Sequence, residues 1–163
     1  MTQMDLPTTT PPTSAHVRIP PGFYYFAGLG LGVAIDRVAA VPFPVAGGGV
    51  VRVGAFCLAA GSAVVLVSVL SLWMAGTPVD PMKPTRALVT RGIYRLSRNP
   101  NYVGLAIGYI GAALLVGSLS SLLLLPGILM IFQCHVIPRE ERYLQQLLGH
   151  AYAEYLSRVR RWL

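Results

Sequence analysis

Four apolar segments constrain the fold of this chain more than any other feature of its sequence. They run over Phe23–Val41, Val50–Trp73, Tyr102–Val116 and Leu119–Ile137. A helix needs about twenty apolar residues to cross roughly 30 Å of hydrocarbon, and the second segment meets that length comfortably. The third and fourth segments are short and separated by a brief turn, so we expect a tight helical hairpin there. The pattern predicts an all-α, polytopic membrane protein with about four transmembrane helices.

The placement of the basic residues predicts how these helices are oriented. With four spans, the N-terminal tail, the loop between spans two and three, and the C-terminal tail share one side. Eleven of the thirteen basic residues fall on that side: Arg18, Lys83, Arg86, Arg91, Arg95, Arg98, Arg139, Arg142, Arg158, Arg160 and Arg161. Basic loops remain in the cytoplasm, so both termini are expected there, in a multi-pass protein of a bacterial inner (plasma) membrane. Topology thus accounts for the net charge of +7, and nucleic acid is not needed as a partner.

The two ends of the chain differ in character. Residues 1–21 are rich in Thr and Pro, which predicts a disordered cytoplasmic tail. A cleaved signal peptide ending near Ala40 is the less favoured alternative. Residues 22–163 are expected to form a single membrane domain that closes with cytoplasmic helices in 138–163.

Small residues and one charged pair interrupt the apolar segments. Gly28 with Gly32, and Gly104 with Gly108, have the spacing that lets membrane helices pack closely. Asp36 precedes Arg37, and we interpret the two as an ion pair at the membrane interface.

A polar stretch before the third apolar segment carries most of the chemically useful side chains. Thr90–Gly104 holds three arginines, two tyrosines and two asparagines within twelve residues. Pro100 predicts the start of a helix, since proline suits the first helical turn. By composition alone, a basic loop before a membrane helix and a functional site are equally good interpretations of this stretch.

A second polar stretch follows the last apolar segment. Pro138-Arg139-Glu140-Glu141 is expected to open a helix that ends near Gly149, with a short helix over His150–Ser157 after it. Carboxylates in a first turn are also ordinary helix chemistry, so a purely structural role stays open.

Together the two stretches could bind a methyl donor such as S-adenosylmethionine. Its amino group needs a carboxylate, its carboxylate needs a basic group, and its sulfonium favours an aromatic face. The sequence lacks the strand–helix alternation of a dinucleotide-binding fold, so any such site has to be built from helices and loops.

The order of residues in both stretches resembles a known family. Leu88–Gly104 reads Leu-Val-Thr-x-Gly-x-Tyr-x-x-x-Arg-Asn-Pro-x-Tyr-x-Gly, and a Glu-Glu…Leu-Gly…Tyr…Tyr pattern runs from Glu140 to Tyr155. These motifs resemble the isoprenylcysteine carboxyl methyltransferases and their phospholipid methyltransferase relatives, over about Pro78 to Trp162. The resemblance implies S-adenosylmethionine-dependent methyl transfer to a hydrophobic or lipid-like acceptor. Asn99 stands where many members have His, so this position cannot titrate near neutrality.

The resemblance also implies roles for individual residues, and it implies no metal site. Glu140 and Arg98 are expected at the reacting centre. The expected cofactor-binding residues are Arg86, Ala87, Leu88, Val89, Tyr94, Asn99, Pro100, Asn101, Tyr102 and Glu141. The helical phase set by Leu144 and Leu147 predicts that Glu140 points at the pocket and Glu141 toward its rim.

Several further questions stay open at the level of sequence. A membrane reductase related to the sterol reductases would use NADPH, although those proteins carry many more spans. A non-catalytic membrane partner is the other alternative, and Asn99 leaves it open. His135 could act as a general base, but an interfacial role is favoured. The acceptor's identity is not predicted, and homo-oligomer formation is left open.

Overall fold

The computed structural model describes residues 19–44, 47–78, 85 and 87–163. Every regular element in these residues is helical, which confirms the all-α prediction. In chain order they are α1 (Pro21–Ala39), α2 (Gly48–Met74), the 3₁₀ turn η1 (Gly92–Arg95), α3 (Pro100–Val116), α4 (Leu119–Ile131), the π-helical turn η2 (Phe132–Val136), α5 (Ile137–Leu148) and α6 (His150–Arg158). The predicted tail lies outside the described residues except for 19–21, and Pro21 already begins α1.

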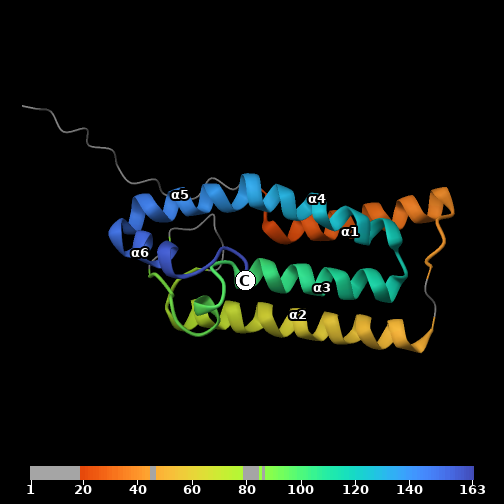
Figure 1. The fold of residues 1–163 in the computed structure, drawn as a ribbon, viewed down its shortest axis with the longest axis horizontal. Coiled ribbons are helices and arrows are strands. Elements are labelled where there is room, and N and C mark those ends of the chain that lie inside the picture. The colour runs from red at the N-terminus through yellow and green to blue at the C-terminus, as the bar shows by residue number, and fades with distance from the viewer. Residues whose placement is uncertain (1–18, 45–46, 79–84, 86) are drawn as a thin grey trace, which may run out of the picture.

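The helices form two pairs that lie side by side (Figure 1). The main partner of α2 is α3, and α1 packs against α4 and α3. The hairpin predicted between α3 and α4 is present: Gly117 ends α3 in the left-handed conformation at φ 65°, and Ser118 caps α4. The short helix α6 folds against α5 at the end of the molecule where α3 begins (Figure 1).

Close glycine contacts hold the helices together. A Cβ atom at Gly61 of α2 would overlap the backbone of Gly108 of α3, and one at Gly104 would lie 2.9 Å from the Gly61 carbonyl oxygen. A Cβ at Gly32 would overlap Ser121 of α4. Both predicted glycine pairs therefore lie at helix–helix contacts, where the absence of side chains lets the backbones approach.

One long helix replaces the predicted break at Pro138. The chain runs from α4 through η2 into α5 without interruption, and Pro138 lies in the first turn of α5. Proline is tolerated there because a π-helical turn has already altered the hydrogen-bond pattern. This continuous helix, Leu119–Leu148, and α2 are the two described helices that are long and apolar enough to span a membrane, while Pro100–Val116 is apolar but shorter.

The π-helical turn is also the centre of the core. Phe132 is fully buried. Its ring centroid lies 5.1 Å from that of Tyr25 and 4.8 Å from that of Tyr102. Such aromatic pairs add to the free energy gained from burial alone. Phe132 thereby packs α1 and α3 against the long helix, just before the polar helix α5 begins.

Asp36 makes a contact that differs from the expected pair with Arg37. Its carboxylate accepts hydrogen bonds from the Ser118 hydroxyl at 2.5 Å and from the Ser120 amide at 3.2 Å. The carboxylate therefore binds the start of α4, where unpaired amides favour a negative charge. The interpretation as a local Asp36–Arg37 pair was wrong, because a partner 82 positions away in the chain meets the carboxylate.

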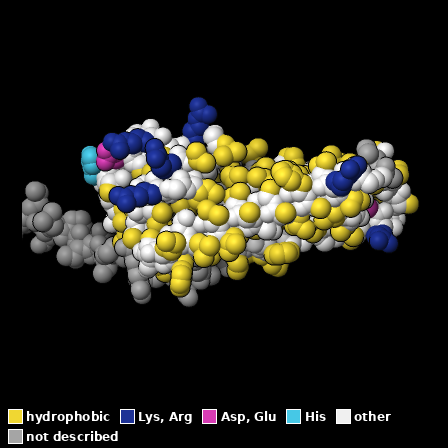
Figure 2. All heavy atoms as spheres, turned by 90° about the horizontal axis from the view of Figure 1, so that it is seen from below, with side chains coloured by type: hydrophobic (Ala, Val, Ile, Leu, Met, Phe, Trp, Pro, Cys, Tyr) yellow, Lys and Arg dark blue, Asp and Glu magenta, His cyan; other side chains and the backbone are white. Residues whose placement is uncertain are grey.

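The outer surface follows the apolar pattern of the sequence. On the face in Figure 2, hydrophobic side chains cover the middle of the molecule, and basic side chains lie toward its ends. Large apolar side chains such as Phe26, Phe56 and Leu123 are exposed on the described helices. Large exposed apolar areas are rare on soluble monomers, and this band fits a lipid environment.

Candidate active site

A cavity of about 540 Å³ lies where α2 ends, α3 begins and α5 meets α6. Its volume is in the range of small-molecule and cofactor sites. All predicted site residues that the structure describes line it: Ala87, Leu88, Val89, Tyr94, Arg98, Asn99, Pro100, Asn101, Tyr102, Glu140 and Glu141. Arg86 lies outside the described residues. The fold thus brings together two segments about forty positions apart.

Sequence reasoning missed several other residues of the cavity wall. The start of α1 contributes Pro20, Pro21 and Gly22, and α2 contributes Leu72. Their apolar character gave no signal that separates them from lipid-facing neighbours. Tyr152 and Tyr155 also line the cavity, and their place in the second motif was such a signal. His135, by contrast, is exposed and is not among the lining residues.

Glu140 is held by a neighbouring tyrosine. The Tyr102 hydroxyl donates a hydrogen bond of 2.5 Å to Oε1 of Glu140. Glu140 lies on α5, beyond the fourth apolar segment of the sequence, which ends at Ile137. Burial raises the pKa of its carboxyl group from 4.5 to about 7; the Tyr102 hydrogen bond opposes this effect, and the charge of Glu141 adds to it. A carboxyl group with this pKa can exchange a proton or gain a cationic partner at neutral pH.

Glu141 has different partners from Glu140. Its two oxygens accept hydrogen bonds from the Arg161 guanidinium, at 3.2 Å from Nε and 2.5 Å from Nη2. Nη2 of Arg98 lies 3.3 Å from Oε1 of the same carboxylate. The Glu141 side chain is only 15% exposed because the two arginines cover it, and its predicted direction toward the rim of the pocket stays a prediction. The helical phase predicted that the two glutamates differ, but it could not predict that Arg161 covers the second one.

Arg98 retains hydrogen-bonding capacity that the described part of the chain does not use. Its side chain is 13% exposed and makes one ion pair, at 3.3 Å. Its Nε is buried and has no hydrogen-bond partner among the residues that the structure describes. A buried donor without a partner costs free energy, so such a group commonly has a ligand as its partner. Because Arg98 lines the cavity, an oxygen of a bound molecule is a suitable acceptor.

Tyrosine hydroxyls fix the walls around these charged groups. The Tyr94 and Ser68 hydroxyls share a hydrogen bond of 2.9 Å, which attaches η1 to α2. Tyr155 donates to the Tyr94 carbonyl at 2.7 Å, and Tyr143 accepts from the Thr85 amide at 3.2 Å. Burial raises the pKa of the Tyr94 and Tyr155 hydroxyls, so both remain neutral donors at physiological pH.

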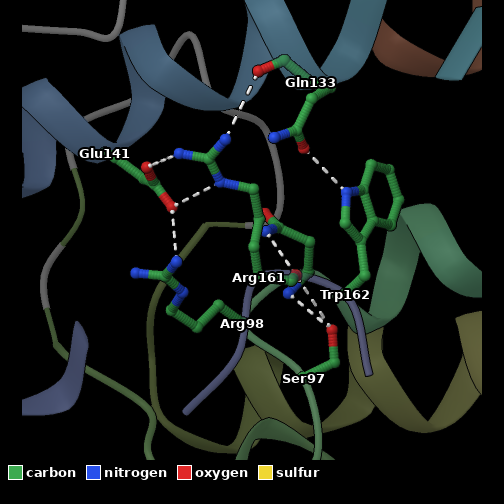
Figure 3. A network of polar contacts seen from close by, with 7 residues as sticks. Ser97, Arg98, Gln133, Glu141, Arg161 and Trp162 are labelled. Carbon is green, nitrogen blue, oxygen red and sulfur yellow. Dashed lines mark hydrogen bonds and ion pairs between the residues drawn. The ribbon is translucent and has the colours of Figure 1, made fainter. Parts of the chain in front are cut away.

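Asn99 faces a partner that its predicted role did not include. Its amide nitrogen donates to the Arg161 carbonyl at 2.9 Å, and the Ser97 hydroxyl lies 3.3 Å from the same oxygen. The backbone amide of Arg98 donates to the Arg160 carbonyl at 2.9 Å. The segment Arg160–Trp162, called the strap below, is therefore bonded along its backbone to the loop that precedes α3. Figure 3 shows the strap between this loop and the long helix.

The arrangement combines an anion, a cation with unused donors, and aromatic walls around one cavity. Such a set can bind a zwitterionic molecule that also carries an apolar or aromatic part. The described residues hold no cluster of His, Cys, Asp or Glu suited to a metal ion.

Comparison with known proteins places the chain among methyltransferases. A family model described as phospholipid methyltransferase matches residues 50–151. Over 72 residues, or 44% of this chain, it is 36% identical to protein-S-isoprenylcysteine O-methyltransferase B of Arabidopsis thaliana and 40% identical to the protein-S-isoprenylcysteine O-methyltransferase of Schizosaccharomyces pombe. These matches cover only 36% and 30% of the length of those two proteins, and no solved structure matches significantly. Because the family model matches more than half of the residues of this chain, the chain belongs to the phospholipid methyltransferase family.

Proposed function

We propose that this chain transfers a methyl group from S-adenosylmethionine to a hydrophobic or lipid-like acceptor at the cytoplasmic surface of the membrane. Family membership supports methyl transfer, and the names of the relatives support a lipid-modified or lipid-like acceptor. The observation that carries the proposal is the presence, around one cavity, of the Glu140 carboxyl group and of the Arg98 guanidinium, whose buried Nε has no partner among the described residues.

The residues around the cavity fit the chemical groups of this cofactor. Glu140 would accept hydrogen bonds from the ammonium group, since Glu141 is already occupied by two arginines. Arg98 would donate to the carboxylate. Ala87, Leu88 and Val89 supply an apolar wall for the adenine, and the tyrosines supply aromatic surface for the sulfonium.

The protein's contribution to the reaction would be positioning. S-adenosylmethionine, when bound, supplies a methyl group that its sulfonium has already activated. Glu140 and Arg98 orient the amino-acid part, and Tyr102 holds the Glu140 carboxyl group in one rotamer. The buried walls exclude water from the reacting atoms. The cavity also borders Pro21 and Leu72, at the ends of two apolar helices, and we place the acceptor's entry there.

The proposal includes a topology of four spans with the cavity on the cytoplasmic side of the inner membrane. Of the described basic residues, only Arg37 and Arg52 belong to the last turn of α1 and the first turns of α2. Figure 1 shows these two helix ends at the end of the molecule opposite α6 and the start of α3, which border the cavity. The positive-inside rule supports the proposed position of the cavity and of both termini in the cytoplasm. A water-soluble donor would thus enter from the aqueous side.

Calorimetric titration of the purified chain in nanodiscs tests the function. We expect saturable binding of S-adenosylmethionine and none of NADPH. Binding of NADPH without S-adenosylmethionine would overturn the proposal in favour of a reductase. Binding of neither would support the non-catalytic alternative.

A further inference from the structure

Arg161 contacts several residues next to the cavity, yet neither motif includes it. Its guanidinium binds both oxygens of Glu141, and its Nη1 lies 3.4 Å from the Gln133 carbonyl oxygen in the π-helical turn. The next residue, Trp162, donates from its indole nitrogen to Oε1 of Gln133 at 2.8 Å. Figure 3 shows the Arg161 guanidinium between Glu141 and Gln133, with Arg98 on the other side of Glu141.

We propose that Arg161 is a positioning residue that keeps Arg98 available for the carboxylate of the methyl donor. This inference rests on the proposed function. It assigns different roles to the two arginines that share the Glu141 carboxylate: Arg98 binds the donor, and Arg161 keeps Arg98 available.

Competition for Glu141 is the first step of the argument. A carboxylate accepts a bidentate pair from one guanidinium, and this arrangement is the strongest that the two groups form. Arg161 already holds that bidentate position. Arg98 is left with a single contact at 3.3 Å, and its Nε remains without a partner among the described residues. Without Arg161, Glu141 would draw the Arg98 guanidinium into the vacated bidentate pair.

The local charge gives the second step. Arg98, Glu141 and Arg161 together carry a net positive charge, because two cations share one anion. Removing Arg161 would leave a neutral pair. A partly buried site of positive charge binds a carboxylate, whereas a neutral ion pair has little attraction for one.

The third step is that hydrogen bonds to the backbone of the strap hold the two arginines in fixed positions relative to each other. The Arg98 amide binds the Arg160 carbonyl, and the Asn99 side chain binds the Arg161 carbonyl. The main chain of the strap therefore fixes the backbone position of Arg98. The side chain of Arg161, by occupying Glu141, keeps the Arg98 guanidinium free to bind a ligand.

The test compares two donors that differ only in the group concerned. We would titrate the full chain in nanodiscs with S-adenosylmethionine and with its decarboxylated analogue. For Arg161→Gln we expect the dissociation constant of S-adenosylmethionine to rise about tenfold, equivalent to about 1.4 kcal/mol. The affinity for the decarboxylated analogue should stay within about twofold of that of the unsubstituted chain.

Two further variants keep the test decisive. Arg158→Gln removes the same charge from a nearby exposed arginine, whose side chain is 71% exposed and pairs with Glu154, and should leave both affinities unchanged. Arg161→Lys keeps the charge but cannot form the bidentate pair, so it should weaken S-adenosylmethionine binding by an intermediate amount. If Arg161→Gln does not fold, Arg161→Lys carries the comparison.

Several outcomes would overturn the inference. Equal losses for both donors in Arg161→Gln would indicate a purely structural role. An equal loss in Arg158→Gln would indicate a general charge effect. No binding of either donor by the unsubstituted chain would instead refute the proposed function.

Discussion

The hydroxyl group of Tyr102 lies 2.5 Å from Oε1 of Glu140 and so joins the start of α3 to the start of α5. This contact places the family's two motifs on one cavity wall, although 38 positions separate the residues. It also leaves the second Glu140 oxygen for a ligand, whereas Glu141 uses both of its oxygens on arginines. The two adjacent glutamates should therefore differ in their effects when they are substituted.

We expect Glu140→Gln to weaken S-adenosylmethionine binding at least about thirtyfold, because a buried carboxylate that meets an ammonium group is worth about 2–5 kcal/mol on truncation. Glu141→Gln keeps a hydrogen-bond acceptor for the two arginines, so it should weaken S-adenosylmethionine binding by at most about tenfold. Calorimetry on both variants gives the ranking. A larger effect at Glu141 would mean that the ammonium group binds there and that Arg161 moves aside.

The raised pKa of Glu140 predicts a pH dependence of donor binding. The free carboxyl group has a pKa of about 7, and only its ionised form attracts an ammonium group. Affinity should therefore fall as the pH is lowered from 7.5 to 5.5, by up to about tenfold per pH unit below 7. Glu140→Gln should show a nearly flat profile. A profile that is flat in the unsubstituted chain would show that Glu140 does not bind the ammonium group.

The same shift predicts an effect on stability with the opposite sign. The pKa of Glu140 is higher in the folded chain than its usual 4.5, so folding favours the protonated form, and stability without donor falls as the pH rises through 7. Glu140→Gln should raise Tm relative to the unsubstituted chain at pH 8 and have little effect at pH 5. Thermal unfolding followed by tryptophan fluorescence checks this, and a lower Tm at pH 8 would contradict it.

Asn99 should act through the strap. Asn99→His retains a donor for the Arg161 carbonyl and should keep most of the stability and donor binding. Asn99→Leu leaves that carbonyl with only the longer Ser97 contact and should cost about 1–3 kcal/mol of unfolding free energy. Denaturant titration in detergent measures the difference. Equal stability of the two variants would show that the Asn99–Arg161 contact contributes nothing.

The residues of the cavity that could be predicted are those with a local signal. Polar residues and family motifs interrupt the apolar segments at Leu88–Tyr102 and Glu140–Glu141. Both features can be recognised in the sequence alone. The hairpin at Gly117 and the helix start at Pro100 were predictable for a similar reason, because proline and glycine restrict the backbone locally.

The contacts that could not be predicted depend on long-range packing. Arg161 is one of several basic residues near the end of the sequence, and nothing local distinguishes it from Arg158 or Arg160. Asp36 has an adjacent arginine but binds Ser118 instead. The π-helical turn at Phe132 rotates α5 relative to α4, and a regular 3.6-residue period cannot predict that rotation.

Topology can be tested with single cysteines in a chain whose Cys57 and Cys134 have been replaced by alanine. Gly48→Cys and Gln146→Cys introduce thiols at exposed positions, at the start of α2 and near the end of α5. These two helix ends lie at opposite ends of the molecule (Figure 1). A membrane-impermeant maleimide added to intact cells should label the Gly48 position and leave the Gln146 position unlabelled until the membrane is opened. Labelling of both from the outside would refute the orientation.

The last prediction concerns the contact between α2 and α3. A Cβ atom at Gly61 would overlap the Gly108 backbone, which cannot move without shifting α3, so Gly61→Ala should destabilise the fold by about 1–3 kcal/mol. Gly108→Ala is the matched control, since its Cβ meets nothing within 4 Å, and it should change stability by no more than about 0.5 kcal/mol. Unfolding in mixed micelles with increasing sodium dodecyl sulfate compares the two. Because α3 begins at the cavity, Gly61→Ala should also weaken donor binding, and equal behaviour of both variants would mean that the two helices do not pack through Gly61.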